Sequence, residues 1–155
     1  MTQIWKFLYP LILLGAMPAG SNTIVATGII RLIPDEQSAV QRGAALYQAN
    51  CASCHGANLE GETNWRRPTT DGRRRAPPHD ETGHTWHHPD KFLFDVTKFG
   101  VPERDGEPPS NMPAYRDQLT DTEIVAVLSF IKSTWPADLR EYHDYLNSRS
   151  LKEGG

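Results

Sequence analysis

Apolar residues first recur at helical spacing in residues 35–50, DEQSAVQRGAALYQAN. Val40, Gly43 and Tyr47 fall three or four positions apart, which predicts a helix with one buried face. Asp35 is the expected N-cap, because its short carboxylate can accept a hydrogen bond from the first helical turn. A glycine inside a helix costs about 1 kcal/mol relative to alanine, so Gly43 is expected where a second helix approaches closely.

A second helical pattern covers residues 88–100, HPDKFLFDVTKFG. Pro89 suits the first turn of a helix, and Gly100 is a natural C-terminal stop. The spacing of the apolar residues predicts a buried face made of Phe92, Leu93, Val96 and Phe99.

The clearest helical pattern is LTDTEIVAVLSFIKSTWP, residues 119–136. Thr120 and Glu123 have the spacing of a capping box, in which the two side chains satisfy backbone N–H groups at the start of the helix. Pro136 is expected to end the helix. The apolar stripe is predicted to be Ile124, Val127, Leu128 and Ile131.

The last helical pattern is short and amphipathic, in residues 137–149, with Leu139, Tyr142 and Leu146 on one side. No segment alternates polar and apolar residues with the period of two that marks a strand. The hydropathy pattern therefore predicts an all-α fold of three to five helices connected by long loops.

The predicted loops, residues 56–88 and 101–118, hold most of the prolines outside the leader. Structureless loops as long as the first are unusual in a compact domain unless something organises them. Only 38% of the 155 residues are apolar, which is low for a globular chain. A bound apolar cofactor would supply the core volume that the side chains do not.

The N-terminal segment lacks charged residues from Phe7 to Ile30, and Lys6 precedes it. We interpret residues 1–33 as a signal peptide, with cleavage near residues 19–21, or as a retained membrane anchor. Either interpretation places the rest of the chain outside the cytoplasm, because the lysine stays inside. The domain is then expected to span residues 34–150, followed by a disordered tail at 151–155.

The net charge of −3 disfavours binding to nucleic acid. The charge is nevertheless unevenly distributed, since five arginines fall within ten residues: Arg66, Arg67, Arg73, Arg74 and Arg75. This arginine run is either a solvated loop, a docking patch, or a clamp on an anionic group.

Both cysteines of the chain lie in one short stretch, NCASCHG, where Cys51 and Cys54 are followed by His55. A disulfide would connect the two cysteines but give the histidine no role. A redox dithiol would need a βαβ context, and none is visible. Zinc would need two more ligands from distant histidines. The C-x-x-C-H spacing instead matches the haem c attachment motif and puts all three residues on one face of a helical turn.

An iron held by His55 needs a second axial ligand on its other side. Met112 is the only methionine outside the leader, and it lies in a loop, PPSNMPAY, that prolines are expected to stiffen. The rival ligands are the histidines of the loop at residues 79–88: His79, His84, His87 and His88. The last three could also form a separate copper or zinc site.

Three stretches of residues 36–136 together resemble class I cytochromes c, the small mono-haem c-type cytochromes of bacteria. They are GAALYQANCASCHG, NMPAY and EIVAVLSFIKSTWP. The resemblance implies a cytochrome c fold wrapped around one covalent haem c, with Cys51 and Cys54 as attachment points and His55 and Met112 as iron ligands. It implies that the terminal helices cross, with Gly43 and Tyr47 against the residue 124–128 stripe. It also implies that Pro77 or Pro78 marks a carbonyl that accepts a hydrogen bond from the His55 ring.

With two axial ligands the iron has no open position, so the resemblance implies an electron carrier and not an enzyme. The expected partners are redox proteins: a quinol-oxidising complex, a terminal oxidase or a dehydrogenase. The expected location is the periplasm, as a soluble protein or tethered through residues 1–33. Two alternatives are a haem-based sensor or enzyme with open iron, and a copper- or zinc-handling protein that uses the His79–His88 loop.

Overall fold

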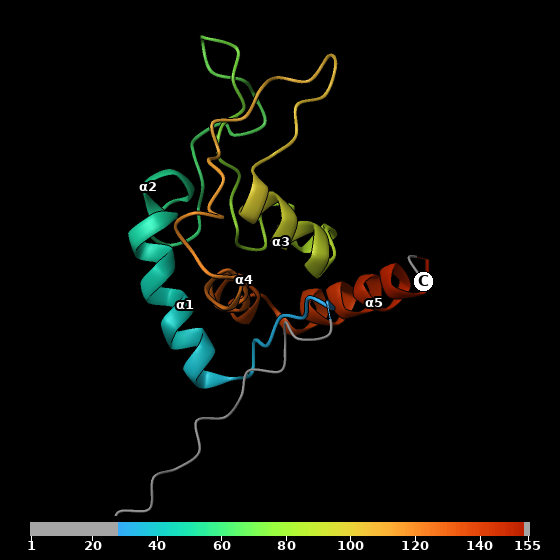
Figure 1. Ribbon diagram of the computed structural model, residues 1–155. Coiled ribbons are helices and arrows are strands. Elements are labelled where there is room, and N and C mark those ends of the chain that lie inside the picture. The colour runs from blue at the N-terminus through green and yellow to red at the C-terminus, as the bar shows by residue number, and fades with distance from the viewer. Residues whose placement is uncertain (1–27, 154–155) are drawn as a thin grey trace, which may run out of the picture.

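The computed structural model describes residues 28–153, and the helices found there enclose a small core (Figure 1). Its helices are α1 (Gln37–Asn50), α2 (Ala52–His55), the 3₁₀-helix η1 (Thr85–His87), α3 (Asp90–Phe99), α4 (Asp121–Ser133) and α5 (Ala137–Glu153). Within this range there is no strand, only an isolated bridge between Arg74 and Ser110. The all-α prediction is therefore confirmed.

Helices α1 and α4 cross at a steep angle, since Figure 1 views α4 nearly end-on while α1 runs across the picture. Gly43 lies at the crossing, where an added Cβ would overlap the carbonyl oxygen of Ala126 and lie 2.9 Å from the Cβ of Phe130. The ring of Tyr47 packs 5.5 Å from that of Phe130. The close approach predicted at Gly43 is confirmed, but on α4 it is Ala126 and Phe130 that meet Gly43.

The first prediction concerns this crossing. Gly43→Ala should lower the free energy of unfolding by about 1–3 kcal/mol, because the new methyl group has no room between the two helices. Helix propensity alone predicts the opposite sign. Chemical denaturation of the holoprotein measures the difference, and Gln41→Ala, at an exposed position of the same helix, is the matched control. A stabilised Gly43→Ala variant would show that the helices do not meet there.

Helix α4 begins at the capping box that its sequence predicts. The Thr120 hydroxyl accepts a hydrogen bond from the backbone N–H of Glu123, and the Glu123 carboxylate accepts one from the backbone N–H of Thr120. From Ile124 to Lys132 every residue except Phe130 is buried, including Ile124 on one side and Ser129 on another. Helix α4 is therefore central, and α1 and α3 pack against it (Figure 1).

Helix α3 is rotated from the predicted orientation: Leu93 is buried and Phe92 packs against the core as predicted, but Val96 is only half-buried. Its buried residues are Asp90, Leu93, Phe94 and Thr97. Asp90 is inside because its carboxylate accepts a hydrogen bond from the backbone N–H of Leu32, and Thr97 because its hydroxyl donates to the carbonyl of Leu93. Phe99, expected in the apolar face, is 56% exposed. The hydrogen bonds of Asp90 and Thr97 set the orientation of this helix, and the spacing of apolar residues does not reveal such polar contacts.

The packed part of the chain starts earlier than residue 34. Leu32 is buried, Ile30 and Ile33 pack against the core, and the backbone N–H of Ile33 donates to the hydroxyl of Ser129. Residues 30–33 therefore contact the core of the domain, and the leader interpretation of residues 1–27 lies outside the described residues. Between residues 28 and 153, no helix has the length and apolar character needed to cross a membrane.

Helix α5 is longer than the sequence pattern indicates, because it continues to Glu153. Residues 151–153, expected in a disordered tail, are therefore helical. Its inner face centres on His143, which is fully buried, whereas Tyr142 is 42% exposed. The His143 ring packs edge-on at 5.1 Å from that of Trp135 and bonds the carbonyl of His88 at 2.9 Å. A buried histidine thus joins α5 to the histidine-rich loop.

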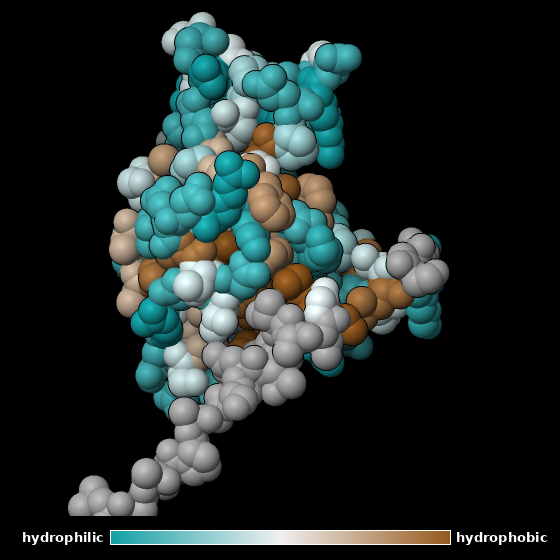
Figure 2. Space-filling model, viewed as in Figure 1, coloured by the Kyte–Doolittle hydropathy of each residue, from teal (hydrophilic) through white to brown (hydrophobic). Residues whose placement is uncertain are grey.

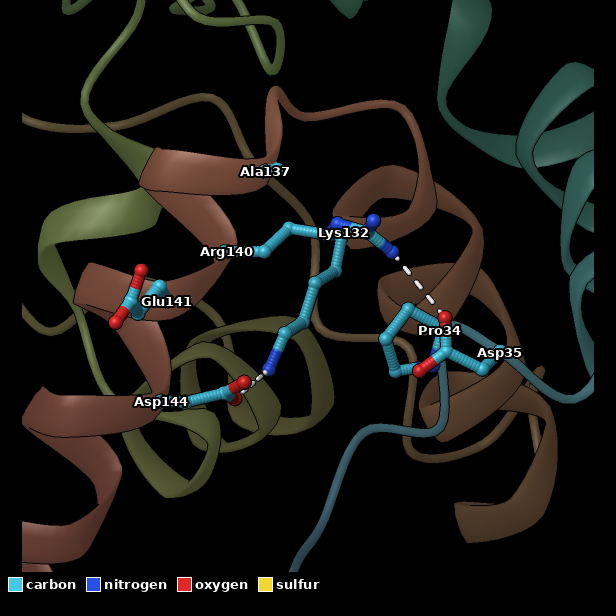
Figure 3. A pocket seen from close by; sticks show the side chains of 7 residues that line it. All are labelled: Pro34, Asp35, Lys132, Ala137, Arg140, Glu141 and Asp144. Atoms are coloured by element: carbon cyan, nitrogen blue, oxygen red, sulfur yellow. Dashed lines mark hydrogen bonds and ion pairs between the residues drawn. The ribbon is translucent and has the colours of Figure 1, made fainter.

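A shallow pocket of about 280 Å³ lies at the start of α5 (Figure 3). Four of its five charged residues pair within the pocket, Lys132 with Asp144 and Arg140 with Asp35. Asp35 does not cap α1, whose N-cap is Glu36 without a side-chain hydrogen bond. The pocket contains neither the C-x-x-C-H segment nor the Met112 loop, and we assign it no ligand.

The second prediction concerns acid stability. Burial lowers the pKa of His143, with a further lowering by Lys132, while Asp90 and Asp144 act in the opposite direction. Below about pH 6.5 the unfolded chain therefore binds a proton that the folded chain excludes, so stability should fall as the pH drops from 7.5 to about 5.5. Thermal unfolding of the holoprotein at both pH values measures this loss. The loss should be smaller in His143→Gln, and an identical loss in both proteins would contradict the assignment.

Candidate haem site

The C-x-x-C-H segment forms a single helical turn directly after α1. Cys51 ends α1 and starts α2, and its carbonyl accepts hydrogen bonds from the backbone N–H groups of Cys54 (3.1 Å) and His55 (2.9 Å). The spacing predicted that these three residues share one turn, and the structure places them so. Both cysteines are free thiols and no disulfide joins them.

The two thiols differ in environment. Cys54 is exposed, whereas Cys51 is half-buried and packs against the hydrophobic core. Burial, with a smaller effect of Cys54, raises the pKa of the Cys51 thiol to about 11. Cys51 is therefore a protonated thiol at neutral pH.

His55 is buried at the end of α2, and its ring orientation is fixed by one hydrogen bond. Its Nδ1 donates to the carbonyl of Pro77 over 2.8 Å, which decides between the two prolines that the sequence left open. Because Nδ1 carries the proton, Nε2 has a free lone pair, as a metal ligand requires. Burial lowers the pKa of His55, outweighing the opposite effects of the Pro77 hydrogen bond and of Glu62, so the ring is neutral.

Gly61 lets the following loop approach Pro77, a role that sequence analysis missed. Its backbone N–H donates to the carbonyl of His55 over 2.7 Å, and its φ of 67° lies in the left-handed region. An added Cβ would lie 2.6 Å from the carbonyl carbon of Pro77. Gly61 thus brings the Pro77 carbonyl within reach of the His55 ring.

Met112 is half-buried in the loop between α3 and α4. The loop is fastened just after it, where the backbone N–H of Tyr115 donates to the carbonyl of Thr97 over 3.1 Å. The hydroxyl of Tyr115 donates to the carbonyl of Asn50 over 2.7 Å, one residue before Cys51. A direct hydrogen bond therefore joins the Met112 loop to the C-x-x-C-H segment, and no sequence spacing pointed to it.

The histidines of the 79–88 loop do not come together as one group, although His84 and His88 lie side by side. The ring of His79 stacks on that of His55, whereas two ligands on opposite sides of one iron would point nitrogens at each other. His84 Nδ1 lies 3.3 Å from His88 Nε2, while the His87 ring stacks on that of Trp86 at 3.7 Å. Across residues 28–153 no group of three or more His, Cys, Asp or Glu side chains could hold a metal ion. The described residues therefore do not bring His84, His87 and His88 together as the three ligands of a separate copper or zinc site.

The arginine run lies in a loop that projects from the helices beside the 100–112 loop, and Figure 2 shows a largely polar surface there. Arg74 pairs with Glu107 (3.3 Å) and Arg75 with Glu62 (3.9 Å). The Nε atoms of both arginines are nevertheless buried without a hydrogen-bond partner among the described residues. Buried N–H groups without partners are rare, so these two donors are candidates for binding an anionic group.

A helical fold with a C-x-x-C-H turn and a neutral histidine whose Nε2 is free defines a small haem-binding protein. A family model described as Cytochrome c matches residues 40–135, and the chain belongs to that family. Its cofactor is covalently attached haem c, and Cys51 and Cys54 fit the C-x-x-C-H motif.

Among solved structures, the chain is similar to cytochrome cL from the marine methylotrophic bacterium Methylophaga aminisulfidivorans MPT. The two are 21% identical, with a TM-score of 0.55, and the match covers 84% of this chain and 76% of the other. This likeness supports the fold alone. A comparison with curated proteins found no match.

Proposed function

We propose that the protein is an electron carrier and not an enzyme, with one haem c whose iron is held by His55 and Met112. Bound haem supplies a single-electron couple, Fe(III)/Fe(II). The observation that carries the proposal is the neutral His55 ring, whose Nδ1 donates to Pro77 and whose Nε2 is left free to bind a metal. The hydrogen bond from Tyr115 to Asn50 supports Met112 as the second ligand, because it joins the methionine loop to the attachment segment.

Cys51 and Cys54 are proposed to hold the porphyrin. Bound haem c would be held through a thioether bond from each thiol to one vinyl group, and forming these bonds would consume no oxidant or reductant. The free state of both thiols fits this attachment, since a disulfide would have to be reduced first.

His55 and Met112 are proposed to set the reduction potential in opposite directions. The hydrogen bond to the Pro77 carbonyl fixes the ring and raises the basicity of His55, which favours Fe(III). Methionine as a ligand raises the potential relative to a second histidine. With both axial positions filled, no position on the iron remains for a substrate.

Arg74 and Arg75 are proposed to donate hydrogen bonds to the haem propionates. The support is their partnerless buried Nε–H groups, which a carboxylate would satisfy. The acidic partners Glu107 and Glu62 hold the two guanidinium groups in place from their other nitrogens.

The proposed partners are redox proteins, such as a quinol-oxidising complex, a terminal oxidase or a dehydrogenase. The proposed location is the periplasm, because a lysine precedes an uncharged apolar leader at the N-terminus. If the leader is retained, it tethers the carrier and raises its effective concentration near membrane partners.

The rival function is a sensor or enzyme with an open iron position. The two are separated by exposing the reduced, purified full chain to carbon monoxide. A carrier with both axial positions filled should keep its absorption spectrum, because the gas must first displace methionine. Rapid formation of a carbon monoxide complex would support the sensor or enzyme instead.

A further inference from the structure

The side chain of His79 lies directly beside His55, the proposed iron ligand, and contacts on its face and its edge fix its ring. Its imidazole ring stacks on that of His55, with centroids 4.0 Å apart and an interplanar angle of 21°. Its own Nδ1 lies 2.8 Å from the hydroxyl oxygen of Thr85, which is itself buried. The ring of His79 is thus fixed by a hydrogen bond on its edge, and its face covers the face of His55.

The backbone of His79 is fixed independently of its ring. Its N–H donates to the carbonyl of Leu59 over 2.7 Å. Its carbonyl accepts a hydrogen bond from Nε1 of Trp135, also over 2.7 Å. These contacts survive any substitution of the side chain other than proline, so the ring can be changed without releasing the loop from the core.

The hydrogen bond between His55 and Pro77 leaves one degree of freedom uncontrolled. It directs Nδ1 toward a carbonyl, but the torsion that turns an imidazole ring has a broad minimum, so the ring plane can rock. A flat group stacked on the face of the ring limits this rocking. His79 is the neighbour that supplies such a face.

We propose that His79 is a positioning residue that fixes the plane of the His55 imidazole, with Thr85 holding the His79 ring in turn. The inference rests on the proposed function, in which His55 binds the haem iron. The plane of an axial imidazole selects which iron d orbital carries the unpaired electron in low-spin Fe(III). That choice determines how spin density is distributed over the porphyrin, and partners outside the ligand set are known to orient ligands in this way.

The test compares ferric holoproteins of the full chain by the paramagnetic NMR shifts of the haem ring-methyl groups, which report the ligand plane directly. His79→Leu removes the flat face, and His79→Phe keeps a flat face without the bond to Thr85. Thr85→Val removes the hydroxyl and keeps the His79 ring. His87→Ala is the control, because the exposed His87 ring stacks on Trp86 and not on an iron ligand.

We expect His79→Leu to change the order or the spread of the methyl shifts, and Thr85→Val to change them in the same direction to a smaller extent. His79→Phe should change the shifts no more than Thr85→Val does, because both keep a flat face and lose the bond to Thr85, and His87→Ala should keep the wild-type pattern. Wild-type shifts in both His79→Leu and Thr85→Val would overturn the inference, and if His79→Leu does not fold, wild-type shifts in Thr85→Val alone would do so. A wild-type protein without low-spin haem would instead overturn the proposed function, so the two failures are distinguishable.

Discussion

Replacing Cys51 and Cys54 together with serine should give a chain that carries no covalent haem. A serine hydroxyl does not form the thioether, so the mass of the denatured protein should equal that of the polypeptide alone. The variant should also lose helicity, because residues 56–84 contain no helix beyond turns and depend on the cofactor for packing. Mass spectrometry and far-ultraviolet circular dichroism measure the two effects.

Ser53→Ala is the matched control, since Ser53 is an exposed residue between the two cysteines. It should retain covalent haem and normal helicity. A haem-sized mass increment in the double serine variant would contradict the assignment of the two cysteines. Normal helicity in its haem-free form would show that the cofactor does not organise the long loop.

Replacing Met112 with alanine should lower the reduction potential and open one side of the iron. Loss of the thioether ligand removes the stabilisation of Fe(II), and axial ligands set haem potentials over a range of roughly 0.8 V, so a fall on the order of 0.1 V is expected. Redox titration measures the potential. The reduced variant should bind carbon monoxide rapidly, unlike the wild type.

Asn111→Ala provides the control for this substitution, because Asn111 is exposed and adjacent in the same loop. It should leave the potential and the response to carbon monoxide unchanged. If Met112→Ala has the wild-type potential and resists carbon monoxide, the second ligand is another residue. The histidines at positions 84 and 88 would then be the next to replace.

Features that depend on local sequence were predictable. The Thr120–Glu123 capping box, the turn that holds Cys51 and Cys54, and the close approach at Gly43 all follow from spacing or backbone preference, and the structure contains each of them. The capping box and the cysteine turn involve residues that are three or four positions apart. Gly43 was informative because a glycine inside a helix lowers the stability of that helix unless it allows close packing.

Features that depend on tertiary partners were not predictable. The orientation of α3 follows from buried Asp90, whose partner Leu32 is distant in sequence. The docking of α5 follows from His143, which no apolar pattern selects. The choice of Pro77 depends on how closely Gly61 lets two loops approach. In each case a polar atom finds its partner through the fold, so the hydropathy pattern carries no signal for it.

The same distinction applies to the candidate site. The sequence is sufficient to select Cys51, Cys54 and His55, because one motif contains them. Met112 was selected by counting methionines, and only the fold adds the hydrogen bond from Tyr115 to Asn50 that joins its loop to the motif. The stacking of His79 on His55 was not visible in the sequence at all.

The central claim is that one covalent haem, ligated by His55 and Met112, makes this protein an electron carrier. The most direct measurement is the absorption spectrum of the purified full chain through a complete cycle of reduction and reoxidation, with its denatured mass. The account predicts a haem-sized mass increment, a low-spin spectrum in both states, and a weak band at the red end of the oxidised spectrum from methionine bound to Fe(III). A high-spin spectrum, or a denatured mass without haem, would contradict it.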